Sequence, residues 1–331
     1  MAHCLVTGGG GFLGQYIVEQ LIARGDAVRS LSRMRYRALE ELGVEHIQGD
    51  IRDLNAVQTA CEGVDIVFHT AGVAGIWGPW ERYHSINAVG ALNVLLAAKQ
   101  QAVPRFVYSS SPSVTFDGTD QCNIDESAPY PKTWLCHYPH TKAIAEQEVL
   151  AANSESFRTC ALRPHLIWGP RDQHLIPRLL DRARKGKLRI VGDGSNLVDM
   201  VYVENAAEAH LLASDAMANP DRNVGGKAYF ISQGEPVNCW DWINEILQLA
   251  GIDAIRKKIP FRVAWHVGHA MEFAYRAMRK TDEPRMTRFL AAQLATSHYF
   301  DISAARNDFG YAPRISTKEG MQRLANWCGT G

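Results

Sequence analysis

Three glycines spaced three residues apart, Gly8, Gly11 and Gly14, follow the short apolar run Cys4-Leu5-Val6 and open an amphipathic segment. This arrangement predicts a strand that turns sharply into a helix, because glycine tolerates positive φ angles and permits a close approach to a bound group. The amides at the N-terminus of such a helix, together with its dipole, favour negative charge. The pattern is typical of a loop that binds a pyrophosphate. Any tight strand-to-helix turn also selects glycine, so the motif needs support from the residues that follow it.

The next residues supply the context that this motif requires. A helical pattern over residues 15–23 ends at Gly25, and the run 27–31 has the composition of a second strand. The apolar residues of the helical pattern fall on one stripe, consisting of Ile17, Val18, Leu21 and Ile22. Together these segments predict a strand-helix-strand unit, in which a glycine-rich turn binds a dinucleotide.

The residue at the end of the second predicted strand bears on which dinucleotide binds. An NAD site typically has a carboxylate there, which accepts hydrogen bonds from the ribose 2′-hydroxyl. This chain has Ser32, followed by Arg33, Arg35 and Arg37. A hydroxyl beside a guanidinium binds a 2′-phosphate with charge assistance, whereas a carboxylate would repel it. The sequence therefore favours NADP(H) over NAD(H). At least one of these arginines is instead expected on the solvated face of the next helix, and Arg37 is the first candidate.

Composition excludes several classes of protein. With 331 residues and 46% hydrophobic content, the chain can bury a large core as one large or two smaller domains. Lys plus Arg equals Asp plus Glu at 35 each, so no net field favours nucleic acid or an anionic membrane. The seven cysteines include no Cys-x-x-Cys pair, which predicts no metal site and fits a reducing compartment. Because no long apolar run is present and the first strand starts at once, we expect a cytoplasmic protein.

Strand-like apolar runs alternate with helical patterns as far as residue 165. Such alternation predicts an α/β fold, a Rossmann doubly wound parallel sheet with helices on both faces. After the first two strands, further strands are expected over 45–48, 66–69, 106–108 and 160–162. Functional groups in this fold lie at the carboxyl ends of the strands. The candidates at these positions are Asp50, Ala71, Gly72, the serines 109–111, and Arg163-Pro164-His165.

The second half of the chain is less regular. Another strand is expected over 198–203, with helices over 205–216 and 239–250. We expect a dinucleotide-binding domain over residues 1–165, completed by about 190–216. A smaller C-terminal substrate-binding lobe would then consist of 166–189 and 217–331.

Segment 261–280 combines an apolar helical stripe with a basic opposite side. The stripe consists of Val263, Val267, Ala270, Met271, Ala274 and Met278, and it is widened by Trp265, Phe273 and Tyr275. Three roles remain open: packing in the core, a mobile lid over an apolar substrate, or contact with a membrane surface or a partner enzyme. The sequence is also compatible with a homodimer.

Tyr138 and Lys142 lie four residues apart, which places a phenol and an amine on one face of a predicted helix. A tyrosine with its free pKa of about 10 is a poor base, but a nearby ammonium group stabilises the phenolate. The tyrosine can then exchange a proton with a carbonyl or alcohol oxygen while hydride moves to or from a nicotinamide. A hydroxyl from Ser109, Ser110 or Ser111, at a predicted strand end, could orient the same oxygen.

Several motifs, in the same order along nearly the whole chain, resemble those of the extended short-chain dehydrogenases/reductases. They are Gly8-x-x-Gly11-x-x-Gly14, Asp50, His69-Thr70-Ala71-Gly72, Asn87-Ala88-Val89-Gly90, Tyr108-Ser109-Ser110-Ser111, Tyr138-x-x-x-Lys142 and Arg163-Pro164. A second set resembles the 3β-hydroxysteroid dehydrogenase branch, and within it the 2-alkyl-3-oxoalkanoate reductases of bacterial olefin biosynthesis. This set is Ser110-Ser111-Pro112-Ser113-Val114, Phe116-Asp117-Gly118, Asp125-Glu126 and Gly310-Tyr311-x-Pro313.

The resemblance implies roles for individual residues. Tyr138 would be the acid/base, Lys142 its pKa modulator and ribose anchor, and Ser111 the hydroxyl that positions the substrate oxygen, with Ser109 or Ser110 as alternatives. Asp50 and Ile51 would contact the adenine, and His165 would lie beside the nicotinamide. The complete set of expected cofactor-binding residues is Gly8, Gly11, Phe12, Leu13, Gly14, Ser32, Arg33, Asp50, Ile51, Ala71, Gly72, Tyr138, Lys142, Pro164 and His165.

The implied activity is NADP(H)-dependent reduction of the 3-oxo group of a large apolar substrate. The first candidate for this substrate is a 2-alkyl-3-oxoalkanoate. A 3β-hydroxysteroid or sterol dehydrogenase is one alternative, and a nucleotide-sugar epimerase or dehydratase is another. Dehydratases of this scaffold carry an Asp-Glu pair beside the catalytic serine, whereas here Pro112-Ser113 follows Ser111. A redox-sensing regulator would typically lack the tyrosine and lysine that this chain retains.

Overall fold

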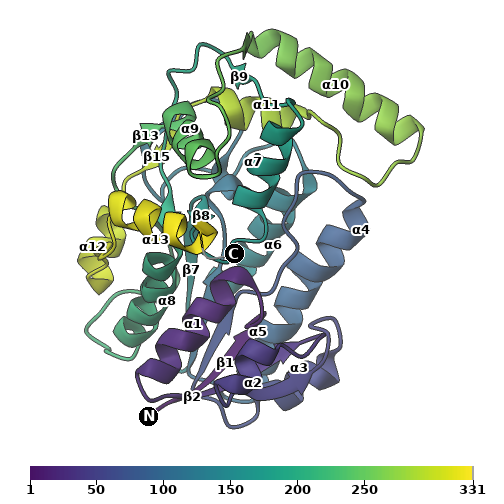
Figure 1. The fold of residues 1–331 in the computed structure, drawn as a ribbon. Helices are drawn as coiled ribbons and strands as arrows, with labels where there is room; N and C mark the ends of the chain where they lie inside the picture. Colours follow the sequence, from purple (N-terminus) through teal and green to yellow (C-terminus); the bar gives the residue numbers. More distant parts are fainter. Residues whose placement is uncertain (330–331) are drawn as a thin grey trace.

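The computed structural model describes residues 1–329, and a parallel sheet of seven strands forms its centre. The strand order is β12-β7-β5-β4-β1-β2-β3 (Figure 1). The strands are β1 (His3–Thr7), β2 (Ala27–Ser32), β3 (Glu45–Gln48), β4 (Ile66–His69), β5 (Arg105–Ser109), β7 (Arg158–Pro164) and β12 (Lys227–Ile231). Because the order reverses between β1 and β4, a crevice opens there at the carboxyl ends of the strands. The predicted Rossmann sheet is confirmed.

Helices cover both faces of the sheet, and each face has its own apolar core. On β1, the side chain of Leu5 belongs to one core, while Cys4 and Val6 belong to the other, as expected of a strand buried on both sides. The helices of one core are α1 (Phe12–Ala23), α2 (Arg37–Glu41), α8 (Val203–Met217) and α12 (Ser303–Phe309). The helices of the other are α3 (Leu54–Cys61), α5 (Ala91–Gln100) and α6 (His137–Ala151).

A third core lies in the C-terminal part of the chain, around Trp168, Trp240 and Trp242. Its principal helices are α7 (Leu175–Arg184), α9 (Cys239–Leu249), α11 (Arg288–Ala295) and α13 (Thr317–Gly329). A four-stranded sheet joins β13 (Val237–Asn238), β10 (Leu197–Val198), β15 (His298–Phe300) and β6 (Gln121–Ile124). Two separate strand pairs are also present: β11 (Val201–Tyr202) with β8 (Ile167–Trp168), and β14 (Lys258–Ile259) with β9 (Ile190–Val191). Short helical segments are α4 (Trp80–Tyr83), η1 (His84–Gly90) and η2 (Pro112–Thr115).

Two parts of the structure differ from the sequence expectation. The strand expected over 198–203 is two short strands, β10 and β11, and Val203 already begins α8. A short apolar run does not distinguish a strand from the first turn of a buried helix. The sheet strand β12 pairs with β7 although it falls within 217–331, the range assigned to the lobe. The C-terminal half therefore contributes the edge strand of the main sheet.

Helix α10 (Phe261–Ala277) lies at the outer edge of the molecule (Figure 1). Its buried line consists of Ala264, Gly268 and Glu272, not of the predicted apolar stripe. The stripe residues Val263, Val267 and Met278 are 47%, 43% and 56% exposed, and Phe273 is 72% exposed. The first of the three expected roles, packing in the core, is therefore wrong for these four side chains. The reason is close contact with α11, since a Cβ on Gly268 would stand 2.7 Å from the carbonyl carbon of Thr287.

Candidate active site

The glycine loop between β1 and α1 has the geometry that the sequence predicts. Gly8 has a φ of +74°, and a Cβ there would stand 2.9 Å from the backbone of Ala71. A Cβ on Gly14 would stand 2.2 Å from the carbonyl oxygen of Gly8. No side chain caps the N-terminus of α1, where Phe12 and Leu13 begin the helix. The loop therefore presents helix amides, free of a side-chain cap, at the crevice beside β1.

A cavity of about 520 Å³ lies against this loop. Eight of the predicted cofactor residues line it: Gly8, Gly11, Ser32, Arg33, Asp50, Ile51, Ala71 and Gly72. Phe12, Leu13 and Gly14 form the start of α1 rather than the cavity wall. Tyr36 and Thr70 also line the cavity, and the motifs did not mark Tyr36. A cavity lined by glycines at a helix N-terminus fits a dinucleotide.

Of the three arginines after β2, Arg33 alone lines this cavity. Arg37 is exposed and pairs with Glu41 at 2.8 Å, so its expected place on a solvated helix face is confirmed. Arg35 lies 3.7 Å from Glu40. The Ser32 hydroxyl donates to the carbonyl oxygen of Met34 at 2.8 Å and lies 2.9 Å from His46 Nε2.

Asp50 also lines this cavity, and its carboxylate pairs with Arg52 at 2.7 Å. The hydrogen bonds from Arg52 hold the pKa of the Asp50 carboxyl below its usual value, and the positive charge of Arg33 acts in the same direction. This carboxylate is therefore charged at neutral pH.

A buried polar pair joins β1 to β4 at the crevice. The hydroxyl of Thr7 lies 2.7 Å from His69 Nδ1, and the Thr70 hydroxyl donates to the carbonyl oxygen of Thr7 at 2.8 Å. Burial lowers the pKa of His69 to about 3, and the charge of Lys142 adds to the effect. The sequence showed His69 only as part of a motif, because its pairing with Thr7 depends on the strand register.

Helix α6 carries Tyr138 and Lys142 on one face, as their spacing predicts. Lys142 is buried, its Nζ donates to the carbonyl oxygen of Ser109 at 2.5 Å, and it lies 4.1 Å from the centroid of the Tyr108 ring. Burial lowers the pKa of Lys142 to about 7, against the opposing charge of Glu146. Burial also raises the pKa of Tyr138, and a hydrogen bond with Ser111 acts in the opposite direction.

The three serines after β5 have different surroundings. The Ser109 hydroxyl is buried and lies 2.7 Å from His210 Nε2. The Ser110 hydroxyl is buried without a hydrogen-bond partner among the described residues. The Ser111 hydroxyl lies 2.8 Å from that of Ser113 and faces a cavity of about 210 Å³ that Tyr138 also lines. The structure thus brings Ser111, rather than Ser109 or Ser110, to the same cavity as Tyr138.

This 210 Å³ cavity, which we call the reaction cavity, has mostly apolar walls. Pro164 and His165 line it, and the His165 ring packs edge-on against His298 and Phe300 with centroids 4.9 and 5.0 Å apart. Burial holds the pKa of His165 well below its usual value, so this imidazole is neutral. Its other lining side chains include Ile76, Phe116, Leu166, Phe289 and Gln293. No motif marked the last two, because α11 reaches the cavity only through the tertiary fold.

Asn87 holds the segment after β4 to helix α6. Its side-chain oxygen accepts from the Val73 amide at 2.7 Å, and its side-chain nitrogen donates to the Val73 carbonyl at 3.0 Å and to Thr141 Oγ1 at 3.3 Å. Asn87 lies in η1, a π-helical turn of the kind found at functional sites. It thereby connects the loop beside the reaction cavity to the helix that carries Tyr138.

Within residues 1–329, no group of three or more His, Cys, Asp or Glu side chains is placed to hold a metal ion. In the same part of the chain, no helix is both long and apolar enough to cross a membrane.

The chain is similar to known proteins over almost its whole length. It is 48% identical to the 2-alkyl-3-oxoalkanoate reductase of Shewanella oneidensis, over 98% of this chain and 86% of that protein. The reductase of the same name from Stenotrophomonas maltophilia is also 48% identical, over 97% of both chains. The human sterol-4-alpha-carboxylate 3-dehydrogenase, decarboxylating, is 34% identical over 97% of this chain and 87% of that protein.

Solved structures share the fold. The crystal structure of gox2253 matches with a TM-score of 0.79 and 28% identity, over 100% of this chain and 98% of that chain. MoeE5 in complex with UDP-glucose and NAD matches with a TM-score of 0.75 and 23% identity, over 99% of both chains, which shows the fold alone. The model of the 3-beta hydroxysteroid dehydrogenase/isomerase family matches residues 5–262. The chain belongs to this family and is an oxidoreductase of the extended short-chain dehydrogenase/reductase type.

Proposed function

We propose that the protein is an NADP(H)-dependent reductase that converts a 2-alkyl-3-oxoalkanoate to the 2-alkyl-3-hydroxyalkanoate. The observation that carries the proposal is the meeting of Tyr138 and Ser111 in an apolar cavity. A keto group has its hydrogen-bonding partners there, and alkyl chains have apolar walls. The 48% identity to proteins named 2-alkyl-3-oxoalkanoate reductase supports this substrate class.

Residues of the two cavities, together with the buried Lys142, would bind different parts of the cofactor. The amides at the start of α1 would bind the pyrophosphate, and Asp50 and Ile51 would contact the adenine. Lys142 would anchor the ribose, with Pro164 and His165 beside the nicotinamide. When bound, the nicotinamide exchanges hydride with the carbonyl carbon of the substrate.

The side chains of the reaction cavity would handle the proton. The raised pKa of Tyr138 keeps its phenol protonated at neutral pH, which suits donation to a carbonyl oxygen. Ser111 would donate a hydrogen bond to the same oxygen and orient it. The phenolate left on Tyr138 would be stabilised by the Lys142 ammonium, which lies one helical turn away.

The preference for NADP(H) would rest on Arg33, which lines the cofactor cavity, with Ser32 at the end of β2. We expect a higher kcat/KM with NADPH than with NADH. Changing Ser32→Asp together with Arg33→Ala should shift the preference toward NADH, because a carboxylate repels the 2′-phosphate and accepts from a free ribose hydroxyl. Arg37→Ala, which removes an exposed arginine paired with Glu41, is the matched control and should leave the preference unchanged. Equal use of both cofactors by the unmodified protein would contradict the assignment.

The substrate class is tested by following NADPH oxidation with three groups of compounds side by side. We expect turnover of 2-alkyl-3-oxo acids, weaker turnover of 3-ketosteroids and none of UDP- or GDP-sugars. A preference for 3-ketosteroids would move the protein to the sterol dehydrogenases. Epimerisation and dehydration consume no NADPH, so the sugars are also assayed by product analysis. Conversion of a nucleotide sugar would make the protein an epimerase or dehydratase.

A further inference from the structure

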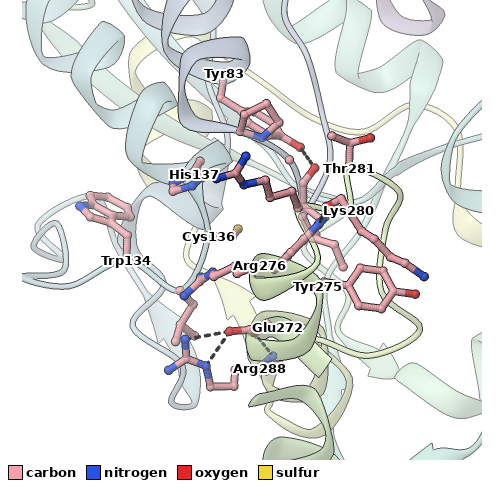
Figure 2. Close-up of a pocket in the computed structure, with 16 residues that line it drawn as sticks. Tyr83, Trp134, Cys136, His137, Glu272, Tyr275, Arg276, Lys280, Thr281 and Arg288 are labelled. Carbon is pink, nitrogen blue, oxygen red and sulfur yellow. Dashed lines mark hydrogen bonds and ion pairs between the residues drawn. The ribbon is translucent and has the colours of Figure 1, made fainter. Parts of the chain in front are cut away.

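A third cavity, of about 460 Å³, which we call the cationic cavity, lies beside the reaction cavity. It is lined by the C-terminal end of α10, the loop 76–79 and the segment 134–137. Figure 2 shows Trp134, Cys136 and His137 on one side of it and residues of the α10 end, such as Tyr275 and Lys280, on the other. Ile76 lines both cavities. Cys136 and His137 directly precede Tyr138 in the chain. The cavity therefore adjoins the reaction cavity, which Tyr138 lines.

The cationic cavity has a strongly positive charge. Arg276, Arg279, Lys280 and Arg288 line it, against a single carboxylate, that of Glu272. Glu272 is already engaged by Arg288, whose guanidinium lies 2.8 Å away and whose backbone amide donates to the carboxylate at 2.7 Å. Within residues 1–329, no carboxylate forms an ion pair with the other three cations. The cavity thus offers uncompensated positive charge, which favours an anionic ligand.

Trp77, in the loop opposite, contacts the end of α10 that carries the cations. Trp77 Nε1 donates to the carbonyl oxygen of Lys280 at 3.1 Å, and the Trp77 ring packs edge-on against Tyr275 with centroids 6.0 Å apart. The Arg276 guanidinium carbon lies 5.7 Å from the centroid of the Trp77 ring. A guanidinium that contacts an aromatic ring keeps its hydrogen-bond donors free for a bidentate partner such as a carboxylate.

Arg279 has an unusual backbone conformation for an arginine. Its φ is +50°, and the amide of Lys280 donates to the carbonyl oxygen of Tyr275 at 2.9 Å, which closes the helix end in the form that normally selects glycine. An arginine in this left-handed conformation costs stability relative to glycine. A side chain that faces a cavity from a strained position is a candidate for a binding role.

We propose that Arg276 and Arg279 bind the carboxylate of the substrate, so that the enzyme selects a free 3-oxo acid over a neutral ketone or ester. This inference rests on the proposed function. In a 3-oxo acid a single carbon separates the carboxylate from the carbonyl carbon. The anion site must therefore adjoin the reaction cavity, and the cationic cavity does so at Ile76, which lines both. The alkyl chains would then lie along the apolar walls of the reaction cavity.

The test uses a stable 2-alkyl-3-hydroxyalkanoate and its methyl ester, oxidised with NADP⁺ by the full-length protein. Arg276→Met should raise the KM for the acid about 10- to 100-fold, the range expected for a lost hydrogen bond between charged groups, with kcat within about threefold. The KM for the ester should not change. Arg262→Met, on the same helix but outside the cavity, is the matched control and should behave as the unmodified protein.

Arg279→Gly separates a binding role from a structural one. Because glycine suits a φ of +50°, the melting temperature of this variant should equal or exceed that of the unmodified protein. The KM of the variant for the acid should nevertheless rise. Equal losses for acid and ester in either variant would overturn the carboxylate site. An unmodified protein that oxidises acid and ester alike, with variants that match it, would leave the reductase proposal intact and refute this inference. No oxidation of either compound, or binding of UDP that Arg276→Met abolishes, would refute both.

Discussion

At the scale of single residues, chemically identical side chains differ by where the fold directs them. Ser109, Ser110 and Ser111 are consecutive, yet the first hydrogen-bonds His210, the second is buried, and the third faces Tyr138 in the reaction cavity. Successive side chains of an extended segment point to opposite sides, which separates Ser110 from Ser109. Ser111 lies beyond the end of β5 and caps η2, so the turn into η2 separates it from Ser109. A serine can therefore be assigned a role here only from its surroundings.

This difference predicts a graded effect of three alanine substitutions. Ser111→Ala should lower kcat about 100- to 1000-fold, the usual cost of removing one donor to a reacting oxygen. Ser110→Ala should change kcat by no more than a few fold. Ser109→Ala should mainly lower the free energy of unfolding, by about 1–3 kcal/mol, because His210 Nε2 loses its buried partner. Steady-state kinetics and urea unfolding of the three variants check this. A Ser110→Ala enzyme as impaired as Ser111→Ala would refute the assignment.

At the scale of elements, α10 packs through its smallest side chains rather than its largest. The buried line of Ala264, Gly268 and Glu272 contacts α11. Trp265 is partly buried and packs against a cluster that contains Phe116 and Phe289, both of which line the reaction cavity. Phe273 is 72% exposed. The two aromatic residues, equivalent in the sequence pattern, thus have different relations to the substrate.

We predict that the efficiency of reduction rises with the alkyl chain length of the 3-oxo substrate, up to about fourfold per methylene until the cavity is filled. Trp265→Ala should flatten this dependence, because it loosens the aromatic wall of the reaction cavity. Phe273→Ala, on an exposed position of the same helix, should leave the slope unchanged. A homologous series of substrates measured with the three proteins provides the comparison. If Phe273→Ala flattened the slope and Trp265→Ala did not, the exposed face of α10 would be the lid.

At the scale of the whole molecule, buried neutral histidines join the layers. His69 at the end of β4 contacts Thr7 at the end of β1, and His210 connects α8 to the end of β5. Burial lowers the pKa of His69 to about 3 and that of His210 to about 4. The unfolded chain takes up a proton on each below its ordinary value of 6.5, whereas the folded protein does not until the lower pKa is reached. Their contribution to stability is therefore complete above pH 6.5 and is lost as the pH falls toward the folded values.

We predict that the free energy of unfolding falls by about 2 kcal/mol for each of these histidines between pH 6.5 and pH 5. Burial raises the pKa of Asp199 to about 6, which opposes this trend, so the total slope alone is not diagnostic. The comparison of His210→Gln with the unmodified protein isolates one histidine, since Asp199 is common to both. Urea unfolding at pH 7, 6 and 5 should give a smaller pH dependence for the variant. Parallel curves would show that the pKa of His210 is the same in the folded and the unfolded protein.

The sequence by itself determined the features that depend on neighbours along the chain. The glycine loop follows from the positive φ that Gly8 permits and from the close approach of the chain that Gly14 permits. The placement of Tyr138 and Lys142 on one face follows from the helical repeat. The alternation of strands and helices up to residue 165 likewise predicted the parallel sheet and the edge at which its functional groups gather. Each of these signals is local, so a single sequence contains it.

Only the tertiary structure decided what depends on contacts between distant segments. It selected Ser111 from three serines, supplied β12 from residues 227–231 to the main sheet, and brought Phe289 and His298 beside His165. It also turned the apolar stripe of α10 outward, because Gly268 allows α10 and α11 to approach closely. The cationic cavity at Arg276 and Arg279 exists only because Trp77, about 200 residues earlier, packs against the end of α10. Side-chain periodicity reports which face of an element is apolar, but the partner of that face is set by long-range packing.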